Sequence, residues 1–336
     1  MVTGISGFIG SALARWLKAD GHWVRGVDAH SPSTGLVARW PEYGTALPGR
    51  DYDEFRRDDL RYNGAALRAV IGCEWVFALA ANMGGIGHII SEQVDVMRDN
   101  TLIDTFTIEA AKRVGIERLL YASSACVYPD DLQRDDRAGL GLRETDVYPA
   151  SPGTAYGWEK LHAEHLCRQY RLAGWVDCRV SRMYTVYGPG DEWWGMRAKV
   201  IPALCRKVAV AKFTGGQELE IWGDGEQRRS FTYIDDCLEG LLRQMGADAA
   251  PLLNLGHAQD VSINELADMI MALADVQLTK RHIAGPEGVR CRASDNSLIR
   301  ATLGWEPTIG LDAGLPPTYA WIEEQVKASL ERSELL

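Results

Sequence analysis

The sequence predicts an α/β fold in which a doubly wound parallel sheet carries a smaller mixed C-terminal lobe. Three observations lead to this fold class. A glycine-rich turn near the N-terminus stands between a short apolar run and a helical pattern. Strand-like and helix-like patterns then alternate through the first half of the chain, which is typical of a parallel sheet covered by helices. Beyond about residue 185 the chain becomes loop-rich and returns only in short stretches to sheet-like runs.

The composition excludes several classes of function. The chain has 336 residues and a formal net charge of −10, which argues against a nucleic-acid binder but permits an anionic small molecule held by local arginines. No apolar run reaches the roughly 18 residues of a membrane span, and the N-terminus lacks the cationic start of a signal peptide. Seven scattered cysteines, with no CxxC pair and no metal-like spacing to histidine, predict a cytoplasmic location and no metal site.

The N-terminal turn predicts a dinucleotide site. Its glycines stand at positions 4, 7 and 10, and a helical pattern follows over residues 11–17. This spacing allows a tight strand-to-helix turn and close approach of backbone to a pyrophosphate. A second predicted strand, residues 23–28, ends in Asp28, where a carboxylate would bind a ribose 2′-hydroxyl and repel a 2′-phosphate, so a Rossmann-like NAD site is favoured over NADP. The alternative is a plain strand-end aspartate in a turn. The predicted cofactor-binding residues of this segment are Gly4, Gly7, Phe8, Ile9, Gly10 and Asp28.

The segments after Asp28 continue the alternation less regularly. The first strand is so short before the glycine turn that either residues precede Met1 or this central strand is unusually short, and residues 31–56 predict an irregular excursion. Asp59 and Leu60, before a predicted helix at 65–71, are assigned to the cofactor site, with Asp59 on an adenine amino group; a helix N-cap is its alternative. Strands are predicted at 75–81 and 118–123, a glycine-rich loop at 82–88 and a helix at 100–114.

Two short motifs predict oxidation of an alcohol. Tyr156 and Lys160 are spaced i, i+4, so both side chains lie on one face of a helix, and a lysine ammonium makes a neighbouring tyrosine easier to deprotonate. Ser124 follows the strand at 118–123 and could hold a substrate oxygen in line with that phenol. Cys126, two residues further on, suggests a second chemical step; its alternative is an inert core cysteine, which we expect for the other six.

The second half predicts a lobe that closes over the substrate. A strand at 175–180 ends the regular alternation, sheet-like runs return at 219–222 and 252–255, and a capping box, Ser262 with Glu265, begins a helix that runs to about residue 274. A last helix is predicted at 315–328. We expect residues 1–185, with a returning segment at about 230–260, to form the NAD-binding domain, and residues 186–336 to form mainly the substrate-binding lobe.

These residues together resemble the extended short-chain dehydrogenase/reductase superfamily over essentially the whole chain. The glycine turn, Asp28, Ser124 and the Tyr156/Lys160 pair carry that resemblance. Within the superfamily the chain is most similar to the GDP-mannose 3,5-epimerase family. The run at residues 222–236 resembles the nucleotide-sugar members of the superfamily in general. The segments that carry the closer similarity are residues 81–85, 122–129, 155–160, 197–199 followed by Pro202, and 285–296.

The resemblance implies a mechanism and a set of site residues. Oxidation of C4 of GDP-mannose makes the C3 and C5 hydrogens acidic, a base and an acid then act on opposite faces of the ring, and the returning hydride restores NAD. The Tyr156/Lys160 pair with Ser124 would serve the oxidation, and Tyr156 and Lys160 would also bind the cofactor. Cys126 and Lys199 would serve the proton transfers. Related enzymes pair through the helices at 100–114 and 156–172, which implies a homodimer. The implied substrate-binding residues are Gly85, Ser124, Thr185, Lys199, Arg229, Arg290 and Arg292, the three arginines holding the diphosphate.

Several alternatives remain open at the level of sequence. Thr185 stands where the family has an asparagine, and Asn82 where the plant enzymes tend to carry an aspartate, so we expect inversion at C5 more firmly than at C3. GDP-L-gulose and GDP-L-galactose are both possible products. The alternative enzyme is another nucleotide-sugar 4-epimerase or 4,6-dehydratase, and the non-enzyme alternative is a dinucleotide-sensing or scaffold protein, which would have no need of the Tyr156/Lys160 pair.

Overall fold

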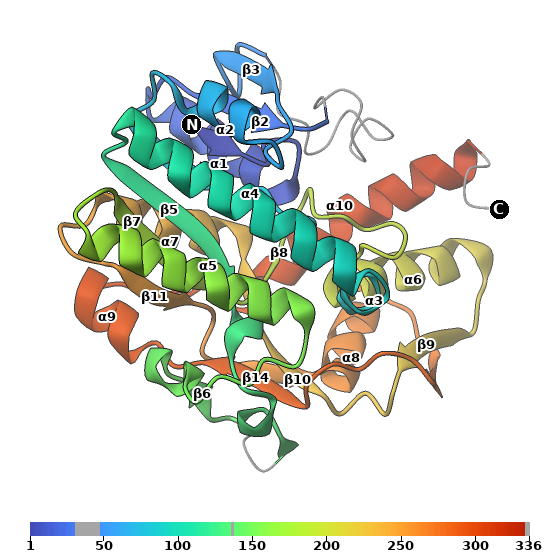
Figure 1. Cartoon of the computed structure of the whole chain (residues 1–336). Helices are drawn as coiled ribbons and strands as arrows, with labels where there is room; N and C mark the ends of the chain where they lie inside the picture. The colour runs from blue at the N-terminus through green and yellow to red at the C-terminus, as the bar shows by residue number, and fades with distance from the viewer. Residues whose placement is uncertain (31–47, 136–137, 333–336) are drawn as a thin grey trace.

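The computed structural model describes residues 1–30, 48–135 and 138–332. Its main element is a seven-stranded sheet in the order β11-β7-β5-β4-β1-β2-β3, in which every neighbouring pair is parallel (Figure 1). The strand order reverses between β1 and β4, and ligands of such sheets bind beyond the carboxyl ends of the strands at this reversal. The strands are β1 (Val2–Thr3), β2 (Arg25–Asp28), β3 (Glu54–Arg57), β4 (Trp75–Ala78), β5 (Arg118–Ser124), β7 (Asp177–Met183) and β11 (Leu252–Leu255).

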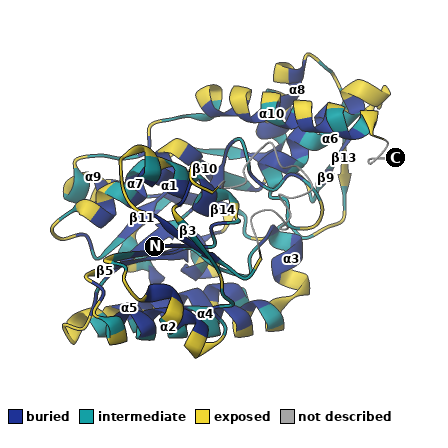
Figure 2. Cartoon of the chain, turned by 90° about the horizontal axis from the view of Figure 1, so that it is seen from above, coloured by how far each residue is buried: buried dark blue, intermediate teal, exposed yellow. Residues whose placement is uncertain are grey.

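Helices cover both faces of this sheet. On one face lie α2 (Asn63–Val70), α4 (Gln93–Val114) and α5 (Ala155–Leu172), and on the other lie α1 (Phe8–Ala19) and α7 (Ile234–Gly246), with α9 (Ser297–Leu303) beside β11 (Figures 1 and 2). Each face buries its own apolar cluster, with Leu13 and Leu241 in one and Ile108 and Leu119 in the other. The predicted doubly wound α/β fold is therefore confirmed.

Several details differ from the sequence prediction. Within the stretch predicted to be irregular, 31–47 lie outside the described residues, but β3 is a regular edge strand. The glycine-rich loop is shorter than predicted, because α3 (Ile86–Ser91) begins inside it. The α4 helix starts at Gln93 rather than at residue 100, since the polar first turn carries little apolar periodicity. Asp59 does not cap α2, whose N-cap residue is Tyr62.

The smaller lobe has a mixed sheet and its own core. In this sheet β10 pairs in parallel with β8 and β14 and antiparallel with β12, and β14 pairs with β6. A two-stranded sheet of β9 and β13 and the helices α6, α8 and α10 complete the lobe. Its elements are β6 (Gly141–Leu142), β8 (Thr185–Tyr187), α6 (Val200–Thr214), β9 (Glu218–Trp222), β10 (Arg228–Tyr233), β12 (Asp260–Ser262), α8 (Ile263–Ala274), β13 (Thr279–Ile283), β14 (Cys291–Ser294) and α10 (Leu311–Glu331).

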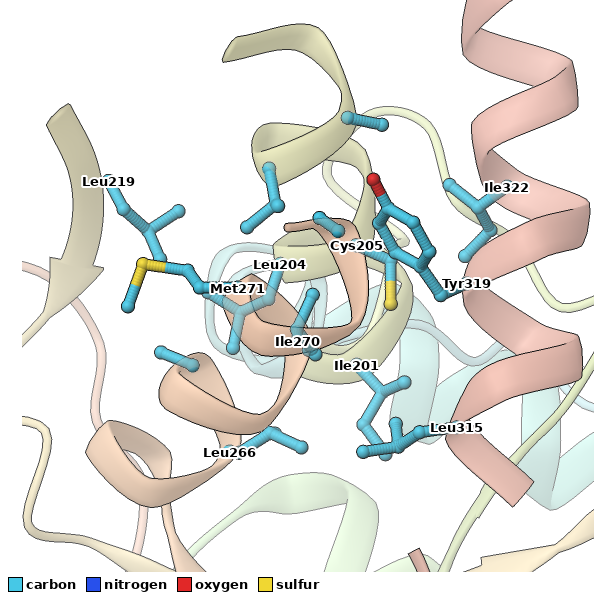
Figure 3. Packing of buried hydrophobic residues seen from close by; sticks show 14 of the residues in the cluster. Ile201, Leu204, Cys205, Leu219, Leu266, Ile270, Met271, Leu315, Tyr319 and Ile322 are labelled. Carbon is cyan, nitrogen blue, oxygen red and sulfur yellow. The ribbon is translucent and has the colours of Figure 1, made fainter. Parts of the chain in front are cut away.

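Apolar packing holds the three helices of this lobe together. Figure 3 shows Leu204 of α6, Ile270 of α8 and Ile322 of α10 pointing into one cluster, where Cys205 is also fully buried. Cys205 therefore has the core role expected of it. The predicted capping box begins α8: the Ser262 hydroxyl accepts from the Glu265 backbone N–H, and the Glu265 carboxylate accepts from the Ser262 N–H. Across the described ranges, no helix combines the length and apolar character needed to span a membrane.

Candidate active site

A cavity of about 930 Å³ lies between the two lobes. The carboxyl end of β5, the loop after β4 and the segments after β7 line it from the large-sheet side, and β10, β14 and the start of α6 line it from the smaller lobe. Volume and lining suit a ligand of drug or nucleotide size. Seven of the residues predicted from sequence line this cavity: Gly85, Ser124, Cys126, Thr185, Lys199, Arg229 and Arg292.

Local structure brings the serine, the cysteine and the tyrosine together. Ser124 ends β5, and its hydroxyl accepts a hydrogen bond from the Cys126 N–H at 3.1 Å, which starts a 3-10 turn over Ala125–Val127. Tyr156 lies in the first turn of α5 and packs against Cys126 in one small apolar cluster. Gly157 makes this approach possible, because a Cβ there would lie 2.2 Å from the Cys126 carbonyl oxygen. The motif Tyr-Gly-Trp-Glu-Lys thus needs its glycine for packing, a requirement that the sequence analysis missed.

Tyr156 and Lys160 lie over a buried polar network. The Lys160 ammonium is 3.7 Å from Asp104 and 3.9 Å from Glu159, and all three side chains are almost fully buried. Tyr121 donates to Asp104 at 2.7 Å, and Asn100 donates to Glu159 at 2.8 Å. The two carboxylates outweigh the burial of Lys160 and raise its pKa, so the lysine stays charged. Behind the tyrosine there is therefore a fixed positive charge.

The charge of Lys160 is only one of several influences on the pKa of Tyr156. Burial raises the pKa of Tyr156, while the charge of Lys160 and a hydrogen bond from Ser124 lower it, and the net pKa lies above the ordinary value. The predicted influence of the lysine has the right sign, but burial has the larger effect. In the free protein Tyr156 is a neutral phenol, poised as a proton carrier rather than standing as phenolate.

The buried acid Glu159 predicts a pH dependence of stability. Burial raises its pKa from 4.5 to about 8. The folded protein therefore holds a proton that the unfolded chain has released, and stability falls as pH rises from about 4.5 to about 8. Burial raises the pKa of the adjacent Asp104 too, which adds a contribution of the same sign. Replacing Glu159 by Gln removes one of these titrations.

We expect the melting temperature of Glu159→Gln to fall less steeply than that of the wild type between about pH 5 and pH 8. At about pH 8 the variant should be more stable than the wild type, and the difference in melting temperature should be several degrees larger there than at about pH 5. Thermal unfolding monitored by circular dichroism across this range measures the effect. A matched control is Glu109→Gln on α4, because hydrogen bonds from Tyr170 and Arg113 lower the pKa of that surface acid. Parallel curves for Glu159→Gln and wild type would contradict the prediction.

Two arginines on neighbouring strands lie side by side in the cavity wall. Arg229 on β10 and Arg292 on β14 are register partners, and both line the cavity. Arg229 donates to the backbone carbonyls of Arg228, Glu287, Val289 and Arg290, and Arg292 donates to Gln133 at 2.6 Å and to the Cys126 sulfur at 3.2 Å. Among the described residues, no carboxylate lies within ion-pair distance of either guanidinium. Burial and the neighbouring charge of Arg292 lower the pKa of Arg229 to about 9.

Arg290 is not part of this pair. It lies just before β14, so the alternation of a strand does not place it beside Arg292. Its guanidinium instead forms ion pairs with Asp135 at 2.9 Å, Asp224 at 3.0 Å and Glu287 at 3.3 Å, and Arg290 itself does not line the cavity. The geometry therefore offers two arginines, rather than the predicted three, to an anionic group.

The two kinds of arginine predict different binding effects. If an anion such as a nucleoside diphosphate binds here, Arg229→Gln should weaken its binding by about 10- to 100-fold, because a charge-assisted hydrogen bond contributes about 1.5–3 kcal/mol. Arg290→Gln should change the affinity by less than about threefold, since an exposed ion pair adds little. Isothermal titration calorimetry with GDP measures both. An equal loss in the two variants would place the anion near Arg290 and contradict this assignment.

The glycine turn forms a cradle that side chains would fill. Gly4 has φ +68°, and a Cβ on Gly10 would lie 2.2 Å from the Gly4 carbonyl oxygen. The turn opens α1, whose free N–H groups favour an anion such as a pyrophosphate. Asp28 accepts from the backbone N–H groups of Ser6 at 3.0 Å and His30 at 3.1 Å, which leaves lone pairs for a ribose hydroxyl. These residues fit the predicted dinucleotide.

Two further residues predicted for the cofactor site, Asp59 and Leu60, make contacts within the protein. Asp59 is bound by the Arg61 guanidinium at 2.7 Å, and hydrogen bonds from Arg61 lower its pKa. Leu60 is buried in the core beneath α2 and α4. Besides Gly157, the sequence also did not indicate Gln133. This buried side chain accepts from Arg292 through its amide oxygen and donates to the carbonyls of Tyr128 and Pro129. A single glutamine in a loop carries no pattern that would have revealed it.

Comparisons with known proteins point to one family. The family model "NAD dependent epimerase/dehydratase family" matches residues 1–256. The chain is 43% identical to GDP-mannose 3,5-epimerase 1 of rice and to GDP-mannose 3,5-epimerase of Arabidopsis thaliana, in each case over 97% of this chain and 82% of the relative. In structure it is similar to UDP-glucuronic acid 4-epimerase from Bacillus cereus, solved with UDP-glucuronic acid and NAD, with TM-score 0.80, 26% identity and 96% and 98% of the two chains covered.

The alternative of a sensor or scaffold protein is not supported by these relatives, all of which are enzymes by name. The match covers the glycine turn, the Ser124/Tyr156/Lys160 group and most of the cavity. By its sequence, its fold and the site just described, the chain belongs to the NAD-dependent epimerase/dehydratase family of enzymes.

Proposed function

We propose that the protein is a GDP-mannose 3,5-epimerase. One observation carries this proposal: a thiol, Cys126, lies in the cavity beside Ser124 and Tyr156, while Lys199 reaches the same cavity from the other lobe. A 4-epimerase needs only the serine and the tyrosine. A thiol and an amine facing one cavity supply the second acid/base pair that inversion at a ring carbon requires. The relatives from rice and Arabidopsis support the same reaction by name.

The residues divide the reaction between them. Ser124 and Tyr156 hold the C4 hydroxyl, and Tyr156 takes its proton, with the charge of Lys160 offsetting the negative charge that builds on the phenol oxygen. Bound NAD would supply the two-electron acceptor that turns the C4 alcohol into a ketone and the donor that reverses this step. The ketone makes the C–H bonds at C3 and C5 acidic. Cys126 and Lys199 then remove a proton from one face of the ring and return one to the other.

The substrate's diphosphate would lie against Arg229 and Arg292. Because Arg292 also donates to the Cys126 sulfur at 3.2 Å, the same guanidinium links the phosphate end of the site to the thiol. The glycine cradle, Asp28 and the first turn of α1 would hold NAD. We further propose a homodimer formed by α4 and α5, which expose Val94, Met97 and Trp158 on the surface, and light scattering of the purified chain tests its mass.

Incubation with GDP-mannose in D₂O tests the proposed reaction. Deuterium should appear at C5 and at C3, with GDP-L-galactose and GDP-L-gulose as products, and mass spectrometry with NMR distinguishes the two positions. Exchange at C5 alone would restrict the enzyme to GDP-L-gulose. If the C4 centre inverts without exchange at either carbon, the protein is a 4-epimerase and the proposal is wrong.

A further inference from the structure

Two segments far apart in the sequence meet in the cavity wall. One is the loop 82–85 after β4, and the other is the segment 195–199, which ends in Lys199 at the N-cap of α6. The Gly85 N–H donates to the Arg197 carbonyl at 2.9 Å. In return the Arg197 guanidinium donates to the Met83 carbonyl at 2.8 Å and to the Asn82 side-chain oxygen at 3.2 Å. The two segments are thus tied together by three hydrogen bonds, two of them from one side chain.

The contact leaves no space between the backbones. A Cβ on Gly85 would lie 2.5 Å from the Ala198 carbonyl oxygen. The segment also turns on itself, since Gly195 has φ +76° and its carbonyl accepts from the Ala198 N–H at 3.3 Å. Because Lys199 directly follows the residue that rests on Gly85, a displacement of this contact moves the base of the Lys199 side chain.

The loop side of the contact is anchored to the large sheet. The Asn82 N–H donates to the Asn100 side-chain oxygen at 2.6 Å, and Asn100 donates back to the Asn82 carbonyl at 3.2 Å and to Glu159 at 2.8 Å. The His88 ring nitrogen lies 3.0 Å from the Asn82 side-chain oxygen, the same atom that Arg197 binds. Through Asn100, the loop is attached to the buried network under Lys160. The segment that carries Lys199 is therefore connected, through this loop and Asn100, to the half of the site that holds Tyr156.

Arg197 itself is separated from the reacting atoms. It does not belong to the lining of the cavity, and no carboxylate of the described residues lies within ion-pair distance of its guanidinium. The hydrogen bonds of its guanidinium go to the loop, and the residue is not placed to touch the sugar. The planar fork of the arginine binds the two acceptors through two different nitrogens, whereas a lysine offers a single ammonium nitrogen on a shorter-reaching head group.

We propose that Arg197 is a positioning residue that fixes Lys199 relative to the Tyr156 side of the cavity. The proposal rests on the acid/base role of Lys199 in the proposed function. Proton transfer at the ring carbon that Lys199 serves depends on the contact between Arg197 and the loop 82–85. Oxidation of C4 does not depend on it, because Ser124, Tyr156 and Lys160 are held by β5 and α5.

Arg197→Lys tests the proposal with two separate readouts on the full-length enzyme and GDP-mannose. Solvent deuterium at C5 and C3 measures proton transfer, and quenching with sodium borodeuteride, which labels C4 wherever a ketone is present, measures oxidation. We expect exchange at one or both carbons to fall on the order of 10- to 100-fold, because a displacement of about 1 Å can cost that much. Ketone formation and KM should stay within about threefold of wild type. The control is Arg113→Lys, an exposed arginine of α4 that pairs with Glu109.

Two further variants guard against a simple loss of folding. Asn82→Ala removes one of the two acceptors of Arg197 from the loop side and should reproduce the selective loss. Adding Asn82→Asp to Arg197→Lys offers the ammonium a carboxylate and should restore part of the exchange. A parallel fall of exchange and ketone formation in both Arg197→Lys and Asn82→Ala, or unchanged exchange in both, would overturn the proposal. Absence of exchange in the wild type would instead overturn the proposed function.

Discussion

Cys126→Ser should abolish deuterium exchange at C5 while a ketone still forms at C4. A serine hydroxyl is far less acidic than a thiol, so it cannot exchange a proton with a ring carbon at neutral pH. The change replaces the sulfur atom by an oxygen atom and keeps the hydrogen bond that the backbone N–H of residue 126 donates to Ser124. Loss of an acid/base group costs about 10²- to 10⁴-fold, and we expect the exchange rate to fall by that factor. Mass spectrometry after turnover in D₂O measures exchange, and a borodeuteride quench measures the ketone.

The chain offers a closely matched control in Cys73. This cysteine is also half-buried, and its sulfur also accepts from an arginine, Arg25, at 3.3 Å, but it lies outside the cavity. Cys73→Ser should therefore leave both readouts unchanged. Exchange in Cys126→Ser within tenfold of wild type would mean that another group transfers the C5 proton. Undiminished epimerisation at C4 without exchange would assign the enzyme to the 4-epimerases.

Much of the fold and the oxidation half of the site follow from local patterns in the sequence. The glycine turn at residues 4–10 and the i, i+4 spacing of Tyr156 and Lys160 depend on turn chemistry and helical period, which a few neighbouring residues determine. The capping box at Ser262 is equally local, and α8 begins there. Cys126 could be singled out for the same reason, because it stands a fixed two residues beyond the serine at the end of a strand.

The parts that the sequence could not provide depend on contacts between distant segments. The Arg197 guanidinium reaches Met83 and Asn82, which are 114 and 115 residues away. Arg290 and Arg292 are indistinguishable as arginines two residues apart, but only Arg292 lies inside β14, paired with Arg229, and so points into the cavity. Likewise the lysine beside Tyr156 is visible in the sequence, whereas the burial that raises the pKa of that tyrosine is a property of the folded chain.

Tyr156→Phe should abolish both ketone formation and deuterium exchange. The phenyl ring fills the same buried space and keeps α5 packed against the turn that carries Cys126, so the fold is retained. Only the hydroxyl that takes the C4 proton is lost. We expect a fall of about 10²- to 10⁴-fold in ketone formation, the usual cost of a missing general base. Exchange must fall with it, because C3 and C5 are acidic only beside a C4 carbonyl. Tyr170→Phe on the same helix, whose hydroxyl donates to Glu109 at 2.7 Å on the surface, is the control.

The contrast between this variant and Cys126→Ser determines the order of the steps. Both should lose exchange, but only Cys126→Ser should retain the ketone, since its Ser124, Tyr156 and Lys160 are unchanged. That pattern requires oxidation to come first and proton transfer to follow from it. Exchange that persisted in Tyr156→Phe without a trapped ketone would mean that the ring protons are removed by a route independent of C4. In that case the thiol and the buried Tyr156/Lys160 group would serve separate reactions, although they lie side by side in one cluster.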